Sequence, residues 1–339
     1  MPSPRRTPLH AVVLAIAACF ALALPGLVRA QAWPAKPIRM VVPFPPGGGT
    51  DVAARIIGER LSARLGQPVI IDNKPGAATA IGVGMVISAE PDGYTLLFSG
   101  STSYTVNPAV RSKLGYDPFK QLSPIAIVAR TPLVLVTSAT SPYKTLNDVL
   151  AKAKANPGTL TYATFGAGSA PHLAGELLAN ATGVKLSAIP YKGSAEADIG
   201  VVRADVSMGI DTLAAVNPLV QSGKLRALAV ISEKRSAQMP HVPAYGELQL
   251  SQAMLDGWYA VAAPTGVSPA VRDHLLQALT AVMADPAMGK KLQAQSLEPA
   301  LVGPQALRDV MATKGAKDVA PENLIVTTGS QQEIGRAHV

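Results

Sequence analysis

The feature that most constrains the fold of this chain is a pattern of strand, loop and helix that repeats from Ile38 onward. The first round is an aliphatic run over 38–44, a Pro-Pro-Gly-Gly-Gly loop over 45–49, and a helix that Gly66 ends. Apolar residues recur on every fourth position of this helix, at Ile57, Leu61 and Leu65. Further strands are expected at 69–72 and 95–98. Such alternation predicts an α/β fold with mostly parallel sheets flanked by helices.

The same pattern starts again after a strand expected at 133–137, which predicts a second unit of the same kind. Its expected elements are helices at 146–155 and 171–181 and strands at 160–164, 184–190 and 225–231. The chain then returns through a strand at 258–262 and a helix at 269–284. Two crossings predict two lobes joined by a hinge, with a cleft between them. The expected bounds are 33–138 plus 255–303 for lobe one and 139–254 for lobe two.

Composition and charge narrow the class of function. Hydrophobic residues make up 48% of the chain and aromatic residues only 4%, which favours a folded aliphatic core. The formal net charge is +8, but no block of Lys and Arg with interleaved aromatic residues supports nucleic-acid binding. No metal site is predicted, because the five His residues are far apart and the one Cys lies near the N-terminus.

The first 32 residues are typical of a bacterial export signal, which predicts a periplasmic protein. A pair of arginines at 5–6 precedes an apolar stretch over 11–24, shorter than the roughly 20 residues that a membrane span needs. We expect cleavage near Ala30 or Ala32, with Ala32 preferred. Lipidation of Cys19 is the alternative, because the residues before it resemble a lipoprotein processing box, although the apolar run continues beyond it.

Several short motifs occur together and in one order over residues 33–303. They include Val42-Pro43-Phe44 with Pro46-Gly47-Gly48, Asp72-Asn73-Lys74-Pro75-Gly76-Ala77, Pro91-Asp92-Gly93-Tyr94, Tyr191-Lys192-Gly193-Ser194, and Ser222-Gly223-Lys224-Leu225-Arg226-Ala227. In this order they resemble the extracytoplasmic receptors of tripartite tricarboxylate transporters, also called Bordetella uptake gene (Bug) receptors. Each motif is weak by itself, and the ordered set is specific.

The resemblance implies a type II-like periplasmic binding protein whose two α/β lobes close over a small carboxylate, held largely by loop backbone and trapped water. It implies no cofactor, no chemistry on the ligand, and delivery of the ligand to the permease subunits of the transporter. A monomer is expected. The chain departs from the family pattern in two places: Ala78 and Thr79 stand where glycines are usual, and Arg203-Ala204-Asp205 replaces a Gly-Gly-Gln-like turn. We expect the first of these departures to narrow or reshape the pocket.

The loop over 44–51 is the first candidate site, because it follows a strand and opens a helix. Unsatisfied N–H groups at such a place favour an anion, and glycines let the backbone approach a ligand. No Gly-Lys-Ser/Thr follows, so the loop is not a P-loop. On the pattern alone an ordinary turn is an equally good interpretation, with Asp51 as a cap, and the resemblance favours binding. The predicted ligand-binding residues of this loop are Phe44, Pro46, Gly47, Gly48, Gly49 and Asp51.

A loop of the same design precedes the helix that contains His172, and it is not a dinucleotide fingerprint because Pro171 stands at the third glycine position. Its predicted ligand-binding residues are Thr164, Phe165, Gly166, Gly168 and Ser169. Tyr191, Lys192 and Asp211 follow strands and are further candidates, with Lys192 either pairing a carboxylate or standing in solvent. We expect that a side chain placed at Gly48 or Gly168 displaces the ligand from the backbone.

No catalytic residue is predicted. Ser169, His172 and Asp211 have the residue types of a hydrolase triad, but no Gly-x-Ser-x-Gly elbow accompanies them. The function predicted is therefore a solute-binding receptor for a small carboxylated compound. A secreted hydrolase on a two-lobed scaffold and a ligand sensor for a signalling partner remain the alternatives.

Residues 304–339 are predicted not to be native to the protein. Residues 333–339 can be back-translated into a common sequencing-adapter sequence, and residues 320–332 resemble a segment of pyridoxal-phosphate aminotransferases. The cofactor lysine and the rest of that fold are absent, so no aminotransferase activity is expected. We expect a junction between about Gly303 and Ala320, and therefore a lobe one without a final helix.

Overall fold

The computed structural model describes residues 33–111 and 113–316. The predicted export signal, Cys19 and residues 317–339 of the expected tail lie outside the described residues. The described residues from Lys36 onward form one compact unit. Within the described ranges, no helix has both the length and the apolar character needed to cross a membrane.

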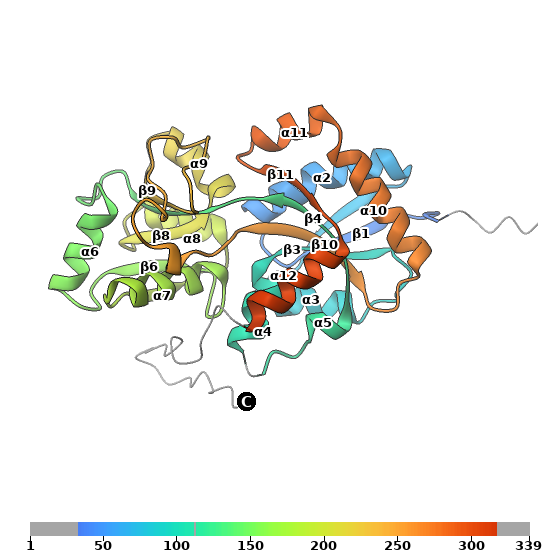
Figure 1. The fold of residues 1–339 in the computed structure, drawn as a ribbon, viewed down its shortest axis with the longest axis horizontal. Helices are drawn as coiled ribbons and strands as arrows, with labels where there is room; N and C mark the ends of the chain where they lie inside the picture. Colours follow the sequence, from blue (N-terminus) through green and yellow to red (C-terminus); the bar gives the residue numbers. More distant parts are fainter. Residues whose placement is uncertain (1–32, 112, 317–339) are drawn as a thin grey trace, which may run out of the picture. The chain divides into compact units, whose positions relative to one another are not determined.

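The first of two sheets has six strands in the order β11-β4-β10-β3-β1-β2. Its strands are β1 (Ile38–Val42), β2 (Val69–Asn73), β3 (Thr95–Gly100), β4 (Leu122–Arg130), β10 (Trp258–Pro264) and β11 (Glu298–Val302). The second sheet has five strands in the order β7-β6-β8-β5-β9. Its strands are β5 (Leu133–Ser138), β6 (Thr161–Thr164), β7 (Ser187–Pro190), β8 (Met208–Thr212) and β9 (Leu225–Ile231). We call the six-stranded sheet with its helices lobe one, and the five-stranded sheet with its helices lobe two (Figure 1).

The helices of lobe one are α2 (Gly49–Leu65), α3 (Ala80–Ile87), α4 (Asn107–Val110), α5 (Pro118–Gln121), α10 (Pro269–Met283), α11 (Pro286–Gln293) and α12 (Pro304–Ala316), with the short turns η1 (Ala77–Thr79) and η2 (Thr102–Val106). The helices of lobe two are α6 (Leu146–Ala155), α7 (Ala170–Thr182), α8 (Ser194–Val202) and α9 (Leu213–Gln221), with the short turn η3 (Ser251–Ala253). The α/β fold predicted from the alternating pattern is therefore confirmed.

Helix α2 illustrates how local sequence produces these elements. The expected stripe is present, because Ile57 and Leu61 are fully buried and Leu65 is partly buried. Gly66 follows the last turn with a φ of 68° and donates its N–H to the carbonyl of Ser62. Only glycine adopts this left-handed conformation at no steric cost, and the helix therefore ends there.

The sheets are mixed, whereas mostly parallel sheets were expected. In lobe one, β1 is parallel to β2 and β3, but β10 is antiparallel to both β3 and β4. In lobe two, β6 is parallel to β7 and β8, but β5 is antiparallel to β8 and β9. Two of the antiparallel strands, β5 and β10, follow the crossings between the lobes, whereas β11 is antiparallel to β4 without a crossing before it. A strand that returns from the other lobe enters its sheet from the opposite end, which reverses its direction.

The first crossing also lies earlier than expected. Strand β5 was assigned to lobe one, but both of its neighbours, β8 and β9, belong to lobe two. The chain therefore crosses between Arg130 and Leu133 rather than near residue 138. The second crossing runs through residues 254–257 into β10, as the expected return near residue 255 required (Figure 1).

A final helix is present in lobe one, which corrects the expectation that it is missing. Helix α12 packs against β4 and η2. Its Leu307 and Met311 are fully buried in a cluster with Tyr104 and Trp258. A helix that completes the core in this way belongs to the fold, so residues 304–316 are not part of a foreign tail.

Candidate functional site

A pocket of about 500 Å³ lies where loops of the two lobes meet, and we call it the outer pocket. Lobe one lines it with Pro43, Phe44, residues 75–79, Thr102 and Arg111. Lobe two lines it with Phe165, Gly166, Ala167, Ser169, Tyr191 and Lys192. The described lining contains two cationic side chains, those of Arg111 and Lys192, and no Asp or Glu. A pocket lined by positive charges raises the local concentration of anions.

A smaller cavity of about 50 Å³ adjoins the outer pocket, and we call it the inner chamber. The two spaces share Phe44, Thr102 and Phe165 as lining residues. The inner chamber is also lined by Gly48 and Gly49 at the start of α2. Its remaining lining includes Thr131, Ser194, Asp211, Thr212, Trp258 and Tyr259.

Some of the predicted residues of the first loop line a cavity, and others do not. Phe44, Gly48 and Gly49 line the inner chamber, but Pro46, Gly47 and Asp51 line neither space. Gly47 has a φ of 85°, a conformation that favours glycine. The glycine-rich sequence is therefore needed partly for the turn itself and partly to bring backbone to the cavity.

Asp51 has a structural role in the first loop. It is buried, and its carboxylate accepts hydrogen bonds from the Gly47 N–H at 3.0 Å, Arg55 Nε at 2.9 Å and Asn73 Nδ2 at 2.9 Å. Burial by itself raises the pKa of Asp51, but these three donors hold the pKa below its ordinary value. The carboxylate thus ties the loop, α2 and the end of β2 together.

We expect Asp51→Ala to lower the free energy of unfolding by roughly 2–3 kcal/mol, because three donors to a charged acceptor lose their partner. Urea denaturation at neutral pH measures this change. Asp273→Ala is the matched control, since Asp273 forms an exposed pair with Arg272 on α10 and such pairs contribute less than about 1 kcal/mol. Equal stability losses in the two variants would contradict the structural role.

The second loop is held against lobe one as well as within lobe two. The N–H of Ala170, the first residue of α7, donates to Thr102 Oγ1 in lobe one at 3.1 Å. The Arg111 guanidinium donates to the carbonyl oxygen of Ala167. Three of the residues predicted to bind the ligand, Phe165, Gly166 and Ser169, line the outer pocket. The two lobes therefore meet through this loop beside the cavity.

Two further predicted residues of this loop do not line either space. Thr164 is buried and its Oγ1 accepts the N–H of Gly166 at 3.3 Å. Gly168 packs on lobe one, where an added Cβ would lie 2.9 Å from Val110 Cγ2 and 3.1 Å from Arg111 Nε. A side chain at Gly168 would thus separate the lobes and not displace a ligand from the backbone. At Gly48 an added Cβ would lie 3.0 Å from Ser194 Cβ of lobe two.

The two helix starts expected to hold an anion differ in their hydrogen bonding. Ser169 caps α7, since its hydroxyl accepts the N–H of His172 at 3.4 Å, and the N–H of Ala170 is used by Thr102. Helix α2 has Gly48 before it and no side-chain cap. Of these two helix starts, α2 is the one that keeps uncapped N–H groups in its first turn, and it can therefore bind an anion through the backbone.

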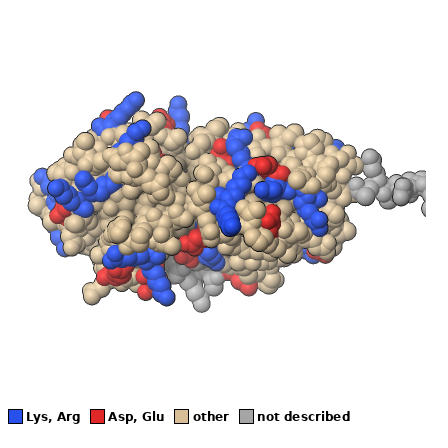
Figure 2. Space-filling model, turned by 90° about the horizontal axis from the view of Figure 1, so that it is seen from above, with Lys and Arg blue, Asp and Glu red and all other residues tan. Residues whose placement is uncertain are grey.

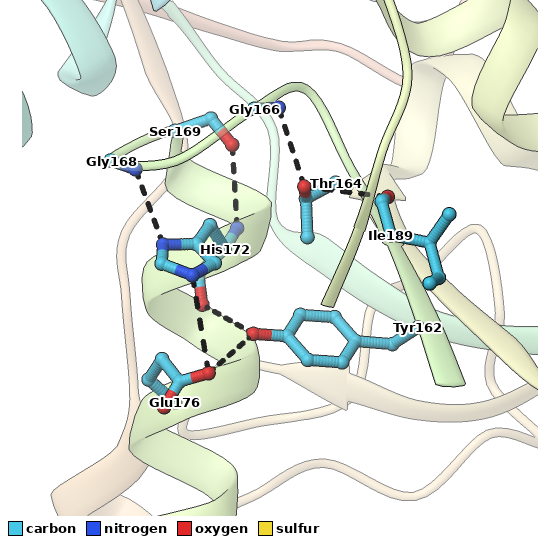
Figure 3. Close-up of polar contacts among 8 residues, drawn as sticks. All are labelled: Tyr162, Thr164, Gly166, Gly168, Ser169, His172, Glu176 and Ile189. Carbon is cyan, nitrogen blue, oxygen red and sulfur yellow. Dashed lines mark hydrogen bonds and ion pairs between the residues drawn. The ribbon is translucent and has the colours of Figure 1, made fainter. Parts of the chain in front are cut away.

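His172 is a structural residue, as Figure 3 shows. Its Nδ1 accepts the N–H of Gly168 at 3.2 Å, and its Nε2 lies 4.0 Å from Glu176 Oε1. The same Glu176 oxygen accepts the Tyr162 hydroxyl at 2.7 Å. Burial lowers the pKa of His172, which keeps the ring neutral at physiological pH.

A hydrolase triad is not assembled. The Ser169 hydroxyl meets the backbone N–H of His172 and not its ring. The Asp211 carboxylate accepts a hydrogen bond from the hydroxyl of Ser194. It accepts a second one from the backbone N–H of Thr212, at 2.6 Å. The three residue types that suggested catalysis therefore have separate partners, and a triad needs them in one chain of hydrogen bonds.

Arg111 is the site residue that sequence reasoning missed. It follows the short helix α4, and no motif of charge or glycine surrounds it. Tyr191 and Lys192, by contrast, were predicted, and both line the outer pocket. Arg111 and Lys192 come from different lobes, so no local pattern relates them.

The loop over 75–79 is a second part of the pocket wall with an unusual backbone. Ala77, Ala78 and Thr79 have φ values of 48°, 47° and 82°. Residues with a Cβ rarely adopt this left-handed conformation. Thr79 is held there because its Oγ1 accepts hydrogen bonds from Ser103 Oγ at 2.9 Å and Asn107 Nδ2 at 3.1 Å. Glycines, which the family resemblance leads one to expect at 78 and 79, suit this backbone better.

On the face in Figure 2, Lys and Arg side chains are spread out and interspersed with Asp and Glu. Within residues 33–111 and 113–316, no group of three or more His, Cys, Asp and Glu side chains is placed to hold a metal ion.

Comparison with known proteins places the chain among solute receptors. The family model described as "Tripartite tricarboxylate transporter family receptor" matches residues 53–323. Protein BugT of Bordetella pertussis is 36% identical over 307 residues, which cover 90% of this chain and 94% of that one. The solved structure of the periplasmic binding protein BugD superposes with a TM-score of 0.80 at 31% identity, covering 84% of this chain and 96% of BugD. The R. palustris protein Rpa4515, solved with adipate, superposes with a TM-score of 0.81 at 32% identity, covering 84% and 95%.

Proposed function

Because this chain belongs to the tripartite tricarboxylate transporter receptor family, we propose that it captures a small carboxylated compound outside the cytoplasm and delivers it to a permease of that transporter type. The family implies a periplasmic, solute-binding protein. The carboxylate specificity, the ligand-binding residues, the permease partner and a monomeric state are the parts that we propose.

The observation that carries the proposal is the charge of the outer pocket. Arg111 of lobe one and Lys192 of lobe two both line it, and no Asp or Glu is among its described lining residues. A guanidinium can pair a carboxylate in a bidentate way, and an ammonium acts as a point charge. A ligand bound between them draws the lobes together, since each cation belongs to a different lobe.

Adjacent apolar surface supports the same class of ligand. Phe44 of lobe one and Phe165 of lobe two line both the outer pocket and the inner chamber. Small-molecule sites combine such apolar walls with a few polar groups that fix orientation. A carboxylate with a short carbon skeleton therefore meets complementary surface at its charged end and along its length.

The proposal is tested by thermal unfolding of the mature protein with a library of carboxylates. A carboxylate at one hundred times its Kd stabilises the folded state by about 2.7 kcal/mol, a shift of several degrees in Tm. The neutral amide of each hit is the matched control and should give a smaller shift. No shift with any carboxylate, together with shifts for another ligand class, would refute the carboxylate specificity.

Two further measurements separate binding from its alternatives. Product analysis after prolonged incubation with a hit should show the compound unchanged, whereas an enzyme would consume it. Delivery is tested by uptake of the labelled compound into cells that lack the gene for this receptor and into cells that carry it. Equal uptake in the two strains would contradict a role in transport while leaving binding intact.

A further inference from the structure

The inner chamber is large and polar enough to receive part of a ligand. Its volume of about 50 Å³ exceeds the ~10–15 Å³ that one water molecule needs. No Lys, Arg or His is among its described lining residues, so the cations of the site are confined to the outer pocket. A ligand that reaches from one space into the other therefore meets different chemistry at its two ends.

Four side-chain polar atoms of the chamber lining are buried without a hydrogen-bond partner in the described chain. They are Thr131 Oγ1, Thr212 Oγ1, Trp258 Nε1 and Tyr259 Oη. The indole N–H can only donate, and each hydroxyl can donate one proton. The uncapped start of α2 adds backbone donors at Gly49 and Thr50, which line the chamber too. Unpaired buried donors are costly, and an acceptor such as a carboxylate relieves that cost.

One acidic side chain also lines this chamber. Asp211 is 2% exposed, and its carboxylate accepts the Ser194 hydroxyl and the Thr212 N–H. A second buried acid, Asp198 on α8, lies close enough for the two charges to interact. Burial raises the pKa of Asp211 to about 6, even though the hydrogen bonds from Ser194 and Thr212 oppose this rise.

The pKa of Asp198 is raised well above its ordinary value, mainly because the side chain is buried and also because of the nearby charge of Asp211. Near neutral pH, which is above its pKa of about 6, Asp211 is largely ionised in the absence of ligand. The other titratable group that interacts with Asp211 is Tyr259 on β10, and burial raises the pKa of its hydroxyl. Among the described residues that line the chamber with Asp211, no Lys, Arg or His supplies a positive charge.

Resting on the proposed function, we propose that the protein takes up one proton together with its carboxylate ligand, and that Asp211 receives this proton in the inner chamber. Two carboxylates enclosed in one small, water-poor space do not both stay ionised, because their repulsion is weakly screened there. The ligand keeps its charge through the chamber donors, and Asp211 binds a proton from solvent. The protonated Asp211 then becomes a donor toward the ligand oxygen.

The experiment is calorimetric titration of the mature protein with adipate at pH 7.5, in two buffers of different ionisation enthalpy. Where adipate gives no heat, the carboxylate with the largest thermal shift replaces it. Both carboxyl groups of adipate are ionised at this pH, so proton uptake reports on the protein. We expect 0.5–1 proton per ligand, and a Kd that rises at least about tenfold from pH 6.5 to 8.5 by proton linkage.

Asp211→Asn mimics the protonated residue. It should abolish proton uptake, make Kd nearly independent of pH, and bind adipate about tenfold more tightly than the wild type at pH 8.5. Asp198→Asn is the matched control, because it removes a buried acid but leaves the titrating one, and it should keep the proton uptake. A gain in affinity cannot arise from a poorly folded protein, so this result does not depend on equal stability.

Two results would overturn the proposal. One is wild-type binding without proton uptake and with a constant Kd, a measurement that needs no variant. The other is unchanged proton uptake in folded Asp211→Asn. Binding without uptake would leave the proposed carboxylate receptor intact, whereas failure of every carboxylate to bind would refute that function and this inference together.

Discussion

Replacement of Gly49 by alanine is expected to lower the affinity for the carboxylate ligand by about tenfold or more, equivalent to about 1.4 kcal/mol. Gly49 begins α2 in lobe one, and a Cβ there would lie 2.5 Å from Thr212 Oγ1 of lobe two and 3.0 Å from Tyr259 Oη. A real Cβ does not approach an oxygen that closely, so Thr212 must move away. This movement opposes the approach of the two lobes around a ligand.

The measurement is calorimetric titration of Gly49→Ala and Gly49→Val, and the larger side chain should have the larger effect. Gly84→Ala is the control, because Gly84 lies inside α3 with nothing within 4 Å of an added Cβ. This control should raise stability by about 0.5–1 kcal/mol, the usual gain for alanine over glycine in a helix, with affinity unchanged. Wild-type affinity in both Gly49 variants would show that Thr212 rotates freely and that the close approach is unimportant.

Removal of the Arg111 charge is expected to have the second large effect. Arg111→Met keeps much of the side-chain length but loses the guanidinium that lines the outer pocket and donates to Ala167 of lobe two. We expect affinity for a carboxylate to fall about tenfold or more, because a charge-assisted hydrogen bond contributes roughly 1.5–3 kcal/mol. Lys192→Met should reduce affinity less, about three- to tenfold, since a flexible ammonium acts only as a point charge.

Lys152→Met on α6 is the matched control, because it makes the same charge change on an exposed residue that lines neither space. The wild-type affinity should also fall as salt rises from low to physiological ionic strength, and that dependence should be weaker in Arg111→Met. If Arg111→Met and Lys152→Met behave alike, the ligand does not contact the guanidinium.

Much of the fold could be predicted from local patterns. The aliphatic runs at 38–44 and 258–262 are strands, and the four-residue stripe of Ile57 and Leu61 is the buried face of a helix. These features follow from the periodicity of side chains along a strand or helix. This periodicity can be recognised without knowing which element the strand or helix packs against. The two-lobed α/β class follows from the order of such elements.

The predictions about the fold that were wrong concern elements whose place depends on contacts with residues distant in the sequence. Strand β5 has the same aliphatic character as a strand of lobe one, and only its pairing with β8 and β9 shows that it belongs to lobe two. The segment of α12 was expected to belong to a foreign tail because residues 320–339 resemble unrelated sequences, yet Leu307 and Met311 fill the core beside Trp258. Pairing and core packing join residues far apart in the chain, and the residue types alone do not specify them.

Some features of the candidate site could likewise be predicted from the sequence, and others could not. The sequence by itself determined that two glycine-rich loops follow strands and open helices, and residues of both loops line the two spaces. Only the tertiary structure decided what each side chain does there. It buries Asp51 against three donors, places Asp211 in a chamber whose described lining has no Lys, Arg or His, and brings Arg111 and Lys192 from different lobes to one pocket. The physical reason is that a charge is governed by its surroundings within a few ångströms, and those surroundings come from segments that only the folded chain brings together.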